Sequence, residues 1–483
     1  MNTDRRAFLK GTAWMGAVAM AAGCTGAKGL GLGSGGSMQG FAAKPLKKVR
    51  VGVCGLGMRG PGAVHRIAAI PGAEIAALCE LHQVRVDAQQ KFLAENGKPK
   101  AKEYVGPEAY KAMCESDDID LVYNATPWQM HVPIALYAME HGKHVAIEVP
   151  SALTLEDCWA LVETAERTRR HCYQLENCCY GEIEMLTMML ARADLLGELK
   201  HAECAYIHDL RDLNYRDWAP DPTKDGKWGY NDYWRLRWNT PHKGNQYTTH
   251  GLGPVCQYMN INRGDRMDYL VSLESQQAGF ELFARQKYPD TWKAELQVAM
   301  GDMNTTLVKT VNGRSIMIQH DVSSPRPYSR INLVSGTKGI LKDYPYQLAL
   351  EESAGAGAHA WFDEKKAGEI REKYKHPLWK KAGEFAQKIG GHGGMDFLMD
   401  LRLIYCLQNG LPLDTDVYDL ATWCSIAELS EKSVRNRSCS MDVPDFTRGG
   451  WKTAPAFGIV DVDLAKMGLD VEKAKSDKSA LNV

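Results

Sequence analysis

From residue 46 to about residue 176, short apolar segments alternate with longer amphipathic ones. The apolar segments predict strands at 49–53, 74–80, 119–126, 143–148 and 172–176. The longer segments carry apolar side chains at helical spacing and predict helices at 62–69, 128–141 and 155–171. Because strands that alternate with helices form parallel, doubly wound sheets, this region predicts an α/β domain that binds its ligands at the carboxyl ends of the strands.

The pattern changes near Lys200, where strands begin to follow one another without long helices between them. These strands are predicted at 201–208, 268–275, 305–311, 315–320 and 330–335. The pair Asn312-Gly313 lies between two of them and is typical of a tight hairpin turn. With helices predicted at 395–408 and 415–434, this region indicates an α+β domain with a large, mostly antiparallel open sheet.

The pattern therefore divides the chain into four parts. Residues 1–45 form an export signal and flexible tether, 46–176 an α/β domain, 177–450 an α+β domain and 451–483 a C-terminal extension. The extension is polar, and we expect it on the surface. Within the second domain, the stretch 209–245 is long, aromatic and rich in turn residues. It is too polar for a core and too aromatic for a linker, so we expect it to line a pocket.

The first residues have the composition of a targeting segment. Asp4–Lys10 contains two adjacent arginines and resembles a twin-arginine export signal, and an apolar run from Gly11 to Ala22 follows it. This run is too short to remain as a membrane-spanning helix. Ala21-Ala-Gly-Cys24 resembles a lipoprotein cleavage site, so a lipid on Cys24 is the one membrane contact we expect, with nearby cleavage and no lipid as the alternative. The predicted location is the periplasm, free or membrane-anchored, and 27–44 predicts the tether.

The charge balance narrows the range of partners. The formal net charge is −1, and no basic stripe marks the chain, which argues against nucleic acid. None of the 13 cysteines forms a C-x-x-C pair, so we expect reduced, buried thiols and no metal site. The sequence leaves open whether the chain forms a homo-oligomer.

The strand at 49–53 leads into a glycine-rich turn, in which Gly55, Gly57 and Gly60 form G-x-G-x-x-G, and Glu80 ends the next strand. Such glycines permit a tight turn, the approach of a pyrophosphate and close helix packing, while an acid at this distance accepts from a ribose hydroxyl. A carboxylate there disfavours a 2′-phosphate, so the pattern predicts a Rossmann domain that binds NAD rather than NADP. The alternative is a glycine-rich turn without a ligand.

The order of the two domains resembles the glucose-fructose oxidoreductase/inositol dehydrogenase family, whose members usually carry Glu-Lys-Pro where this chain has Glu148-Val149-Pro150. The missing lysine argues against a simple sugar dehydrogenase. Four blocks, Asn124–His131, Glu148–Ala152, Trp234–Pro254 and Ser323–Tyr328, resemble glycoside hydrolase family 109, whose members are NAD-dependent α-N-acetylgalactosaminidases. The resemblance covers nearly the whole mature chain and implies a glycan or glycoconjugate substrate with terminal α-N-acetylgalactosamine.

The resemblance also implies residue roles. For NAD, which we expect to be tightly bound and recycled, it implies contacts at Gly55, Gly57, Met58, Arg59, Gly60, Glu80, Trp128, Gln129, Met130, His131, Glu148, Val149 and Asn177. For the sugar it implies Tyr206, Arg235, Tyr247, Thr248, Thr249, His250 and Tyr328. Trp128 and His131 could instead be structural, and His392 in its glycine loop has no assigned role.

The predicted reaction differs from ordinary glycoside hydrolysis, since the aromatic block offers no pair of carboxylates. A nicotinamide site allows oxidation at sugar C3, loss of the C2 proton, elimination at C1, addition of water and reduction, with retention. Tyr247 and His250, three residues apart, share a face if a helix begins near Gln246, and are the predicted acid–base pair, although both could merely bind sugar hydroxyls. The alternatives are a sugar oxidoreductase of the same fold and a non-catalytic sugar-binding protein.

Overall fold

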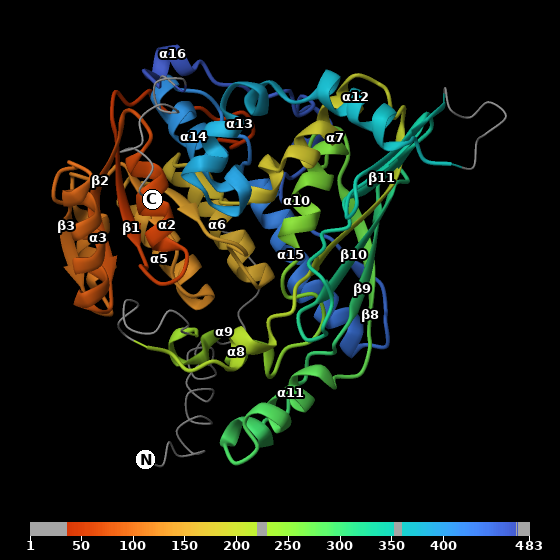
Figure 1. Ribbon diagram of the computed structural model, residues 1–483, viewed down its shortest axis with the longest axis horizontal. Coiled ribbons are helices and arrows are strands. Elements are labelled where there is room, and N and C mark those ends of the chain that lie inside the picture. The colour runs from red at the N-terminus through yellow and green to blue at the C-terminus, as the bar shows by residue number, and fades with distance from the viewer. Residues whose placement is uncertain (1–35, 220–228, 352–359, 470, 472–483) are drawn as a thin grey trace, which may run out of the picture.

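The computed structural model describes residues 36–219, 229–351, 360–469 and 471. Two sheets face each other across a layer of central helices (Figure 1). The predicted export signal and Cys24 lie outside the described residues. No helix in the described ranges is both long enough and apolar enough to cross a membrane.

The first sheet is parallel throughout and has the strand order β3-β2-β1-β4-β5-β6. Its strands are β1 (Val49–Cys54), β2 (Ala73–Glu80), β3 (Lys102–Val105), β4 (Leu121–Asn124), β5 (His144–Ile147) and β6 (Cys172–Gln174). Its helices are α2 (Gly60–Ala68), α3 (Gln83–Glu95), α4 (Ala109–Glu115), α5 (His131–Glu140) and α6 (Leu155–Thr168). The strand order reverses between β1 and β4, and this confirms the predicted Rossmann architecture.

The second sheet has eight strands in the order β13-β12-β11-β7-β10-β9-β8-β14, and only the pair β7 and β10 is parallel. The strands are β7 (Leu199–Ile207), β8 (Met267–Glu274), β9 (Asn304–Thr310), β10 (Ser315–Asp321), β11 (Leu333–Gly336), β12 (Gly339–Lys342), β13 (Gln347–Leu350) and β14 (Met441–Asp442). This confirms the mostly antiparallel sheet, although β11 begins three residues later than predicted.

Helices cover one face of this second sheet. Of these helices, α10 (Thr249–Tyr258) and α15 (Val417–Arg435) pack on the strands, while α7 (Glu182–Arg192) packs on α10 and α12 (Glu364–Tyr374) packs on α7. Helices α13 (Pro377–Ile389) and α14 (Met395–Asn409) pack on each other, and α14 also contacts α2 and β1 of the first domain. At the ends of the molecule lie α8 (Arg211–Tyr215), α9 (Trp234–Asn239), α11 (Gly279–Lys287) and α16 (Leu464–Met467) (Figure 1). The other face leaves Leu273 and Leu307 exposed.

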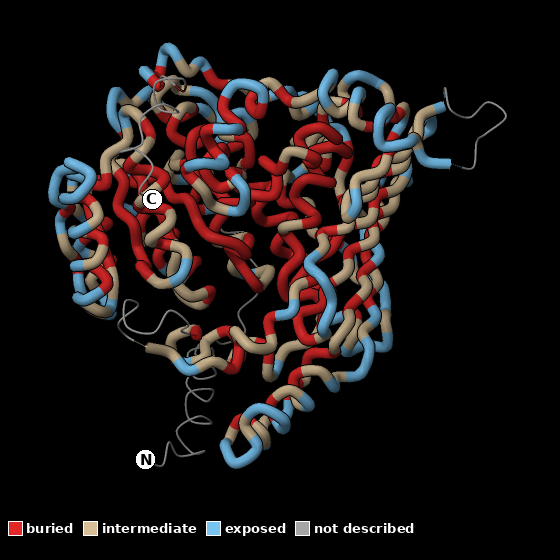
Figure 2. Tube along the Cα trace, in the orientation of Figure 1, coloured by how far each residue is buried: buried red, intermediate tan, exposed pale blue. Residues whose placement is uncertain are grey.

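Helix α15 belongs to both domains. At its centre the Cys424 thiol bonds Gln174 Oε1 of β6 at 3.0 Å, and Glu428 accepts from the amide of Leu155, where α6 begins. Near its end, Ser433 Oγ accepts from Ser272 of β8 at 2.9 Å. Figure 2 shows buried residues running from the parallel sheet through this helix to the antiparallel sheet. The two domains therefore share one core.

Both ends of the described chain differ from the prediction. The amide of Met38 donates to Tyr418 Oη at 3.0 Å, and the Phe41 ring packs on His171, so the part of the predicted tether from residue 36 onward is fixed. In the extension, Val462 and Leu469 are buried, because 451–469 folds back over α14 and its neighbours. Residues 451–469 therefore lie along the surface, as predicted, but a few of their apolar side chains pack into the core.

Candidate active site

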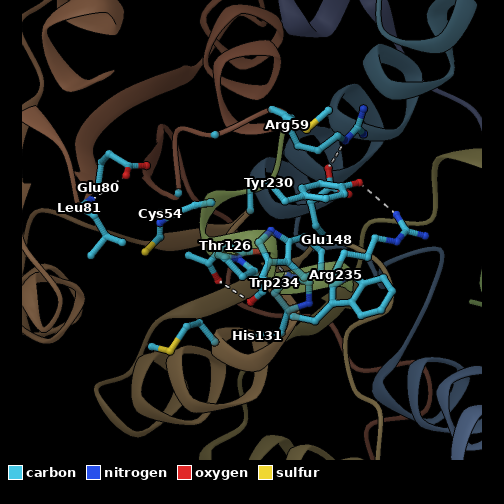
Figure 3. A pocket seen from close by; sticks show the side chains of 18 of the residues that line it. Cys54, Arg59, Glu80, Leu81, Thr126, His131, Glu148, Tyr230, Trp234 and Arg235 are labelled. Carbon is cyan, nitrogen blue, oxygen red and sulfur yellow. Dashed lines mark hydrogen bonds and ion pairs between the residues drawn. The ribbon is translucent and has the colours of Figure 1, made fainter. Parts of the chain in front are cut away.

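A cavity of about 590 Å³ lies between the carboxyl ends of the parallel strands and the second domain. Figure 3 shows Glu80 and Leu81 at one side of this first cavity and Trp234 and Arg235 toward the other. The aromatic stretch that we expected to line a pocket does so, through Tyr230, Trp234 and Arg235 among others. The predicted cofactor site and the predicted sugar site therefore belong to the same cavity.

The glycine turn has the shape of a phosphate cradle. Gly55 has a φ of +87°, and a Cβ there would lie 2.7 Å from the carbonyl oxygen of Ala125. At Gly57 a Cβ would meet no atom within 4 Å, so the backbone at this position is open to a ligand in the cavity. Helix α2 begins at Gly60 with its free N–H groups at this turn. The turn therefore fits the pyrophosphate of a dinucleotide.

Glu80 closes the same turn. One oxygen accepts from the amide of Leu56 at 2.6 Å, and the other accepts from the amide of Leu81 at 2.8 Å. Each carboxylate oxygen has a second lone pair, and the residue lines the cavity, so the geometry leaves room for ribose hydroxyls. Glu80 thus supports the turn in addition to its predicted role at the ribose.

Arg59 extends from the turn across to the second domain. Its Nε donates to Glu148 at 2.9 Å, and its Nη1 donates to Asp396 at 2.9 Å (Figure 3 shows the pair with Glu148). Asn177 donates to the other oxygen of Asp396 at 2.5 Å. Burial raises the pKa of Asp396, but Arg59, His392 and Arg66 outweigh burial and hold that pKa well below its usual range. This charged link fixes the edge of the cavity.

The remaining predicted cofactor residues fall into two groups. Trp128, Met130 and Val149 line the cavity, whereas Gln129 and Gly60 do not. The two ring nitrogens of His131 lie 2.8 Å from the carbonyl oxygens of Pro150 and Thr126, and burial lowers its pKa. His131 therefore connects two strand-end loops, and its contact with a nucleotide stays a prediction.

Tyr247 and His250 meet at the inner end of the cavity. Tyr247 Oη lies 3.3 Å from His250 Nε2, and the two rings are 5.0 Å apart at an interplanar angle of 80°. The predicted helix start at Gln246 was wrong, because α10 begins at Thr249 and leaves Tyr247 before its first turn. The pair is instead brought together by the packing of α10 on β7, where a Cβ on Gly251 would lie 2.5 Å from the amide of Ala205.

Glu176 lies behind His250 and was not among the predicted residues. Its Oε1 lies 2.7 Å from His250 Nδ1, and its side chain is fully buried. Burial raises the pKa of Glu176, but the charge and hydrogen bond of His250 outweigh burial, so the net pKa is lowered. A carboxylate only accepts, so Nδ1 carries the hydrogen and Nε2 of a neutral His250 faces Tyr247 with a free lone pair.

A cation and three rings surround Tyr247. The Arg235 guanidinium lies 5.0 Å from the centre of the Tyr247 ring and 4.8 Å from that of Trp128, and the Tyr206 and Tyr247 rings are 4.3 Å apart. Burial raises the pKa of Tyr206 to about 12 and that of Tyr247 well above its usual value. Both phenols are therefore protonated at neutral pH and can donate to a substrate oxygen.

Three predicted sugar residues lie elsewhere. Thr248 Oγ1 donates to the carbonyl of Trp423 at 2.9 Å, and Thr249 is fully buried, so neither residue lines a cavity. Tyr328 lines a second, adjoining cavity rather than the first. Their contacts with a substrate stay predictions.

Sequence reasoning missed Glu176, His208 and Asp396. His208 lines the cavity, and its Nδ1 lies 3.1 Å from Tyr206 Oη, while burial lowers its pKa to about 4. For Glu176 a signal existed, because an acid two residues past the end of the buried strand β6 lies at the ligand-binding edge of the sheet. Asp396 carried no such signal, because its partner Arg59 is 337 residues away.

Family models match both domains. Residues 49–175 match the oxidoreductase family with an NAD-binding Rossmann fold, and residues 180–453 match the C-terminal domain of glycosyl hydrolase 109. The chain thus contains an NAD-binding Rossmann domain. An α-N-acetylgalactosaminidase of Bacteroides fragilis is 50% identical over 86% of this chain and 95% of its own length. A glycosyl hydrolase family 109 protein of Shewanella pealeana is 46% identical over 88% of this chain and 91% of its own length.

Solved structures of the same fold are more distant. A levoglucosan dehydrogenase in complex with NADH superposes with a TM-score of 0.60 at 16% identity, over 82% of this chain and all of its own. A scyllo-inositol dehydrogenase of Lactobacillus casei gives a TM-score of 0.56 at 14% identity, over 83% of this chain and 99% of its own. These likenesses show the fold, whereas the family follows from the model matches and from relatives near half identity: the chain belongs to glycosyl hydrolase family 109.

Proposed function

We propose that this protein hydrolyses terminal α-N-acetylgalactosaminides in an NAD-dependent cycle. One observation carries the proposal, namely that Tyr247 and His250, with Glu176 behind His250, line the same cavity as the glycine turn. The relative at 50% identity, named as an α-N-acetylgalactosaminidase, supports the choice of sugar.

The carboxylates of the cavity support a route other than displacement by two acids. Among the described lining residues they are Glu80, Glu108 and Glu148. Glu80 is bonded to the glycine turn and Glu148 to Arg59, and Glu176 lies behind His250. None of them faces a second carboxylate across the Tyr247 end of the cavity, which is the arrangement that ordinary glycosidases need.

The cofactor would be held by the turn at Gly55–Arg59, by Glu80, and by Trp128, Glu148 and Asn177 along the floor of the cavity. NAD bound there supplies an acceptor for the hydrogen on sugar C3 and returns it at the end of the cycle. The net reaction consumes one water and leaves the cofactor unchanged. We therefore propose a tightly bound, recycled cofactor.

The chain itself supplies the proton transfers. Oxidation at C3 releases the hydroxyl proton and acidifies the hydrogen on C2, so two bases or one shared base must act at adjacent carbons. His250 Nε2 has the free lone pair for one transfer, because Glu176 holds the hydrogen on Nδ1. Tyr247, 3.3 Å away, can pass a proton to or from the neighbouring oxygen. Loss of the C2 proton expels the C1 oxygen, which takes up a proton and leaves as the alcohol. Water then adds, with its oxygen going to C1 and a proton to C2, and the ketone at C3 is reduced back to the alcohol.

We further propose that the protein is exported folded by the twin-arginine route and acts in the periplasm, free or anchored by a lipid on Cys24. The paired arginines, the short apolar run and the cleavage-site pattern support this. A cofactor that is recycled suits such export, because the protein can leave the cytoplasm with NAD already bound.

The test is hydrolysis of p-nitrophenyl α-N-acetylgalactosaminide in deuterated water without added cofactor. We expect turnover, no accumulation of NADH, and deuterium at C2 of the released sugar. Product without deuterium at C2 would refute the redox route. Accumulating NADH with free sugar and NAD would instead establish the alternative, a sugar oxidoreductase of the same fold.

A further inference from the structure

A short segment of the second domain reaches across to the cofactor end of the first cavity. Residues 216–219, the bridging segment, follow α8 and lie against the start of α3 in the parallel-sheet domain. The ring centres of Trp218 and His82 are 4.8 Å apart, and the Arg85 guanidinium lies 5.8 Å from the centre of the Trp218 ring. Arg85 Nη2 also donates to the carbonyl of Ala219 at 3.2 Å. The bridging segment is therefore bonded to the domain that carries the glycine turn.

The same arginine connects the bridging segment to the glycine turn. Arg85 Nη1 donates to the carbonyl of Leu56 at 3.1 Å, and the Arg85 side chain is buried. Leu56 lies within the turn, and its amide donates to Glu80. A chain of hydrogen bonds thus runs from Glu80, the predicted ribose acceptor, through Leu56 and Arg85 to Ala219 of the second domain.

The other side of the bridging segment is anchored within the second domain. Lys293 Nζ donates to the Tyr215 carbonyl at 2.8 Å and to Asp217 Oδ1 at 2.6 Å, and the Tyr233 hydroxyl donates to the same carboxylate. Lys293 is buried, whereas Asp217 is exposed. Because the segment is held on both sides, the Trp218 ring forms a fixed wall.

Trp218 lines the first cavity beside the residues expected at the adenosine end. Glu80, Leu81, His82 and Tyr110 line the same cavity. In the proposed function Glu80 accepts from the adenosine ribose, so this part of the cavity holds the adenosine half of NAD. The Trp218 ring is half-buried, and an aromatic ring in the wall of a pocket offers an apolar face to a ribose or a base.

We infer that Trp218 encloses the adenosine half of NAD, and that the second domain thereby slows release of the cofactor. The inference rests on the proposed function and names a contact that retains the cofactor between turnovers. For the adenosine half to leave past this wall, the contacts of the Trp218 ring and the bond between Arg85 and Ala219 have to open. The pair Arg59 and Asp396 joins the two domains beside the glycine turn. Cofactor retention is thus a property of both domains.

The first measurement is the exchange of bound nucleotide in the purified protein. Holoenzyme loaded with isotope-labelled NAD is mixed with excess unlabelled NAD, and the label that stays bound is followed by desalting and denaturation. We expect Trp218→Ala to exchange about tenfold faster than the wild type, the size of a lost aromatic contact, and Trp218→Phe to recover most of the difference. Trp361→Ala is the control, since Trp361 is exposed and lines neither cavity.

The wild type separates the two possible failures. A wild type that binds no NAD would refute the cofactor of the proposed function, and this inference with it. A wild type that retains NAD while Trp218→Ala exchanges at the same rate would overturn the inference alone.

A second measurement separates contact with adenosine from a general loosening of the site. AMP and nicotinamide mononucleotide each carry one half of NAD, and both compete with the labelled dinucleotide. We compare the concentration of each that displaces half of the label. In Trp218→Ala the ratio of the AMP value to the nicotinamide mononucleotide value should rise about tenfold. An unchanged ratio would overturn the assignment to the adenosine half, whatever the exchange rate.

A third variant loosens the bridging segment from outside the cavity. Lys293 lines neither cavity, so Lys293→Met removes the bonds to Tyr215 and Asp217 and leaves every lining side chain in place. We expect exchange to become roughly threefold faster, since charge-assisted hydrogen bonds are lost. Lys309→Met is the control, because Lys309 bonds only the Gly313 carbonyl among the hydrogen bonds of its described surroundings. Exchange at the wild-type rate in Lys293→Met would contradict a wall held in place by the second domain.

Discussion

The cofactor end and the sugar end of the first cavity are built in different ways. The cofactor end is formed by backbone: the Gly55–Gly60 turn, the start of α2 and the strand end at Glu80 lie within 26 consecutive residues. The sugar end is formed by side chains from β7, α9, α10 and the end of β6, which are brought together only by the shared core. The cofactor end is therefore shaped mainly by backbone, with Glu80 bonded to its turn, whereas the sugar end depends on contacts between side chains.

The largest effect should follow from removing the base at the sugar end. His250→Ala should lower kcat by about 10²–10⁴-fold, the usual contribution of a general acid–base group, while the bound nucleotide is retained. The measurement is kcat together with nucleotide released on denaturation. His201→Ala, in β7 and lining neither cavity, is the control. Loss of nucleotide with loss of activity would contradict the separation of the two ends.

A smaller effect should follow at the residue behind the base. In Glu176→Gln the amide can donate to His250 Nδ1 and so favour the wrong tautomer, and we expect kcat to fall roughly 10²-fold. Glu176→Asp keeps the acceptor and should recover part of the rate. Substrate KM and the nucleotide content should not change. Equal activity of the Gln variant and the wild type would show that the 2.7 Å contact has no role in orienting the ring.

A substitution at the cofactor end should lower the affinity for NAD rather than kcat. Glu80→Ala removes the acceptors that face the ribose, at a cost of about 1.5–3 kcal/mol for charge-assisted bonds, and also the bonds to Leu56 and Leu81. We expect nucleotide content to fall on purification and kcat to return when NAD is added in excess. Glu74→Ala, earlier on β2 and outside the cavity lining, serves as the control. Recovery of kcat with NADP but not NAD would refute the assignment of the cofactor.

The smallest effect is on stability in acid, and two buried histidines of the parallel-sheet domain contribute to it. Burial lowers the pKa of His144 to about 4 and that of His171 to about 3. The unfolded chain takes up these protons near pH 6.5 and the folded chain does not, so stability falls as the pH drops from about 6.5 toward 4. The loss is at most about 1.4 kcal/mol per pH unit for each histidine.

His171→Phe should therefore make the fall in stability shallower, as measured by urea unfolding at pH 6.5 and pH 4.5. His201→Phe, on the partly exposed side of β7, is the control and should leave the slope unchanged. An unchanged slope in His171→Phe would assign the acid sensitivity to other groups.

The same contrast explains what the sequence could predict. The glycine turn, Glu80 and the strand alternation are local patterns, so the Rossmann domain and its cofactor edge followed from them. The antiparallel sheet also followed, because the pairs β8–β9, β9–β10, β11–β12 and β12–β13 are consecutive in sequence, whereas the pairing of β7 with β10 and β11 could not be predicted from neighbouring segments. Tyr247 and His250, the predicted acid–base pair, are neighbours in space, although the argument from a shared helix face was wrong.

The features that the sequence did not predict involve residues that are far apart along the chain. Asp396, one of the two partners of Arg59, lies 337 residues further along the chain, and no local pattern encodes such a pair. Residues 451–469 were assigned to the surface because their composition is polar, yet Val462 and Leu469 among them complete the core. Thr248 and Thr249 stand next to the pair in sequence, but α10 turns their side chains away from the cavity.

Helix α15 limits how the two domains can be recombined in chimeric proteins. It is encoded after residue 416, yet it completes the packing of α6 and β6 at the other end of the chain. A cut between residues 176 and 177 therefore removes part of the core of the nucleotide-binding domain, because Cys424 and Glu428 belong to the C-terminal fragment. A chimera that joins this nucleotide-binding domain to a foreign catalytic domain has to carry 417–435 with it, as a third piece grafted from the far end of the gene.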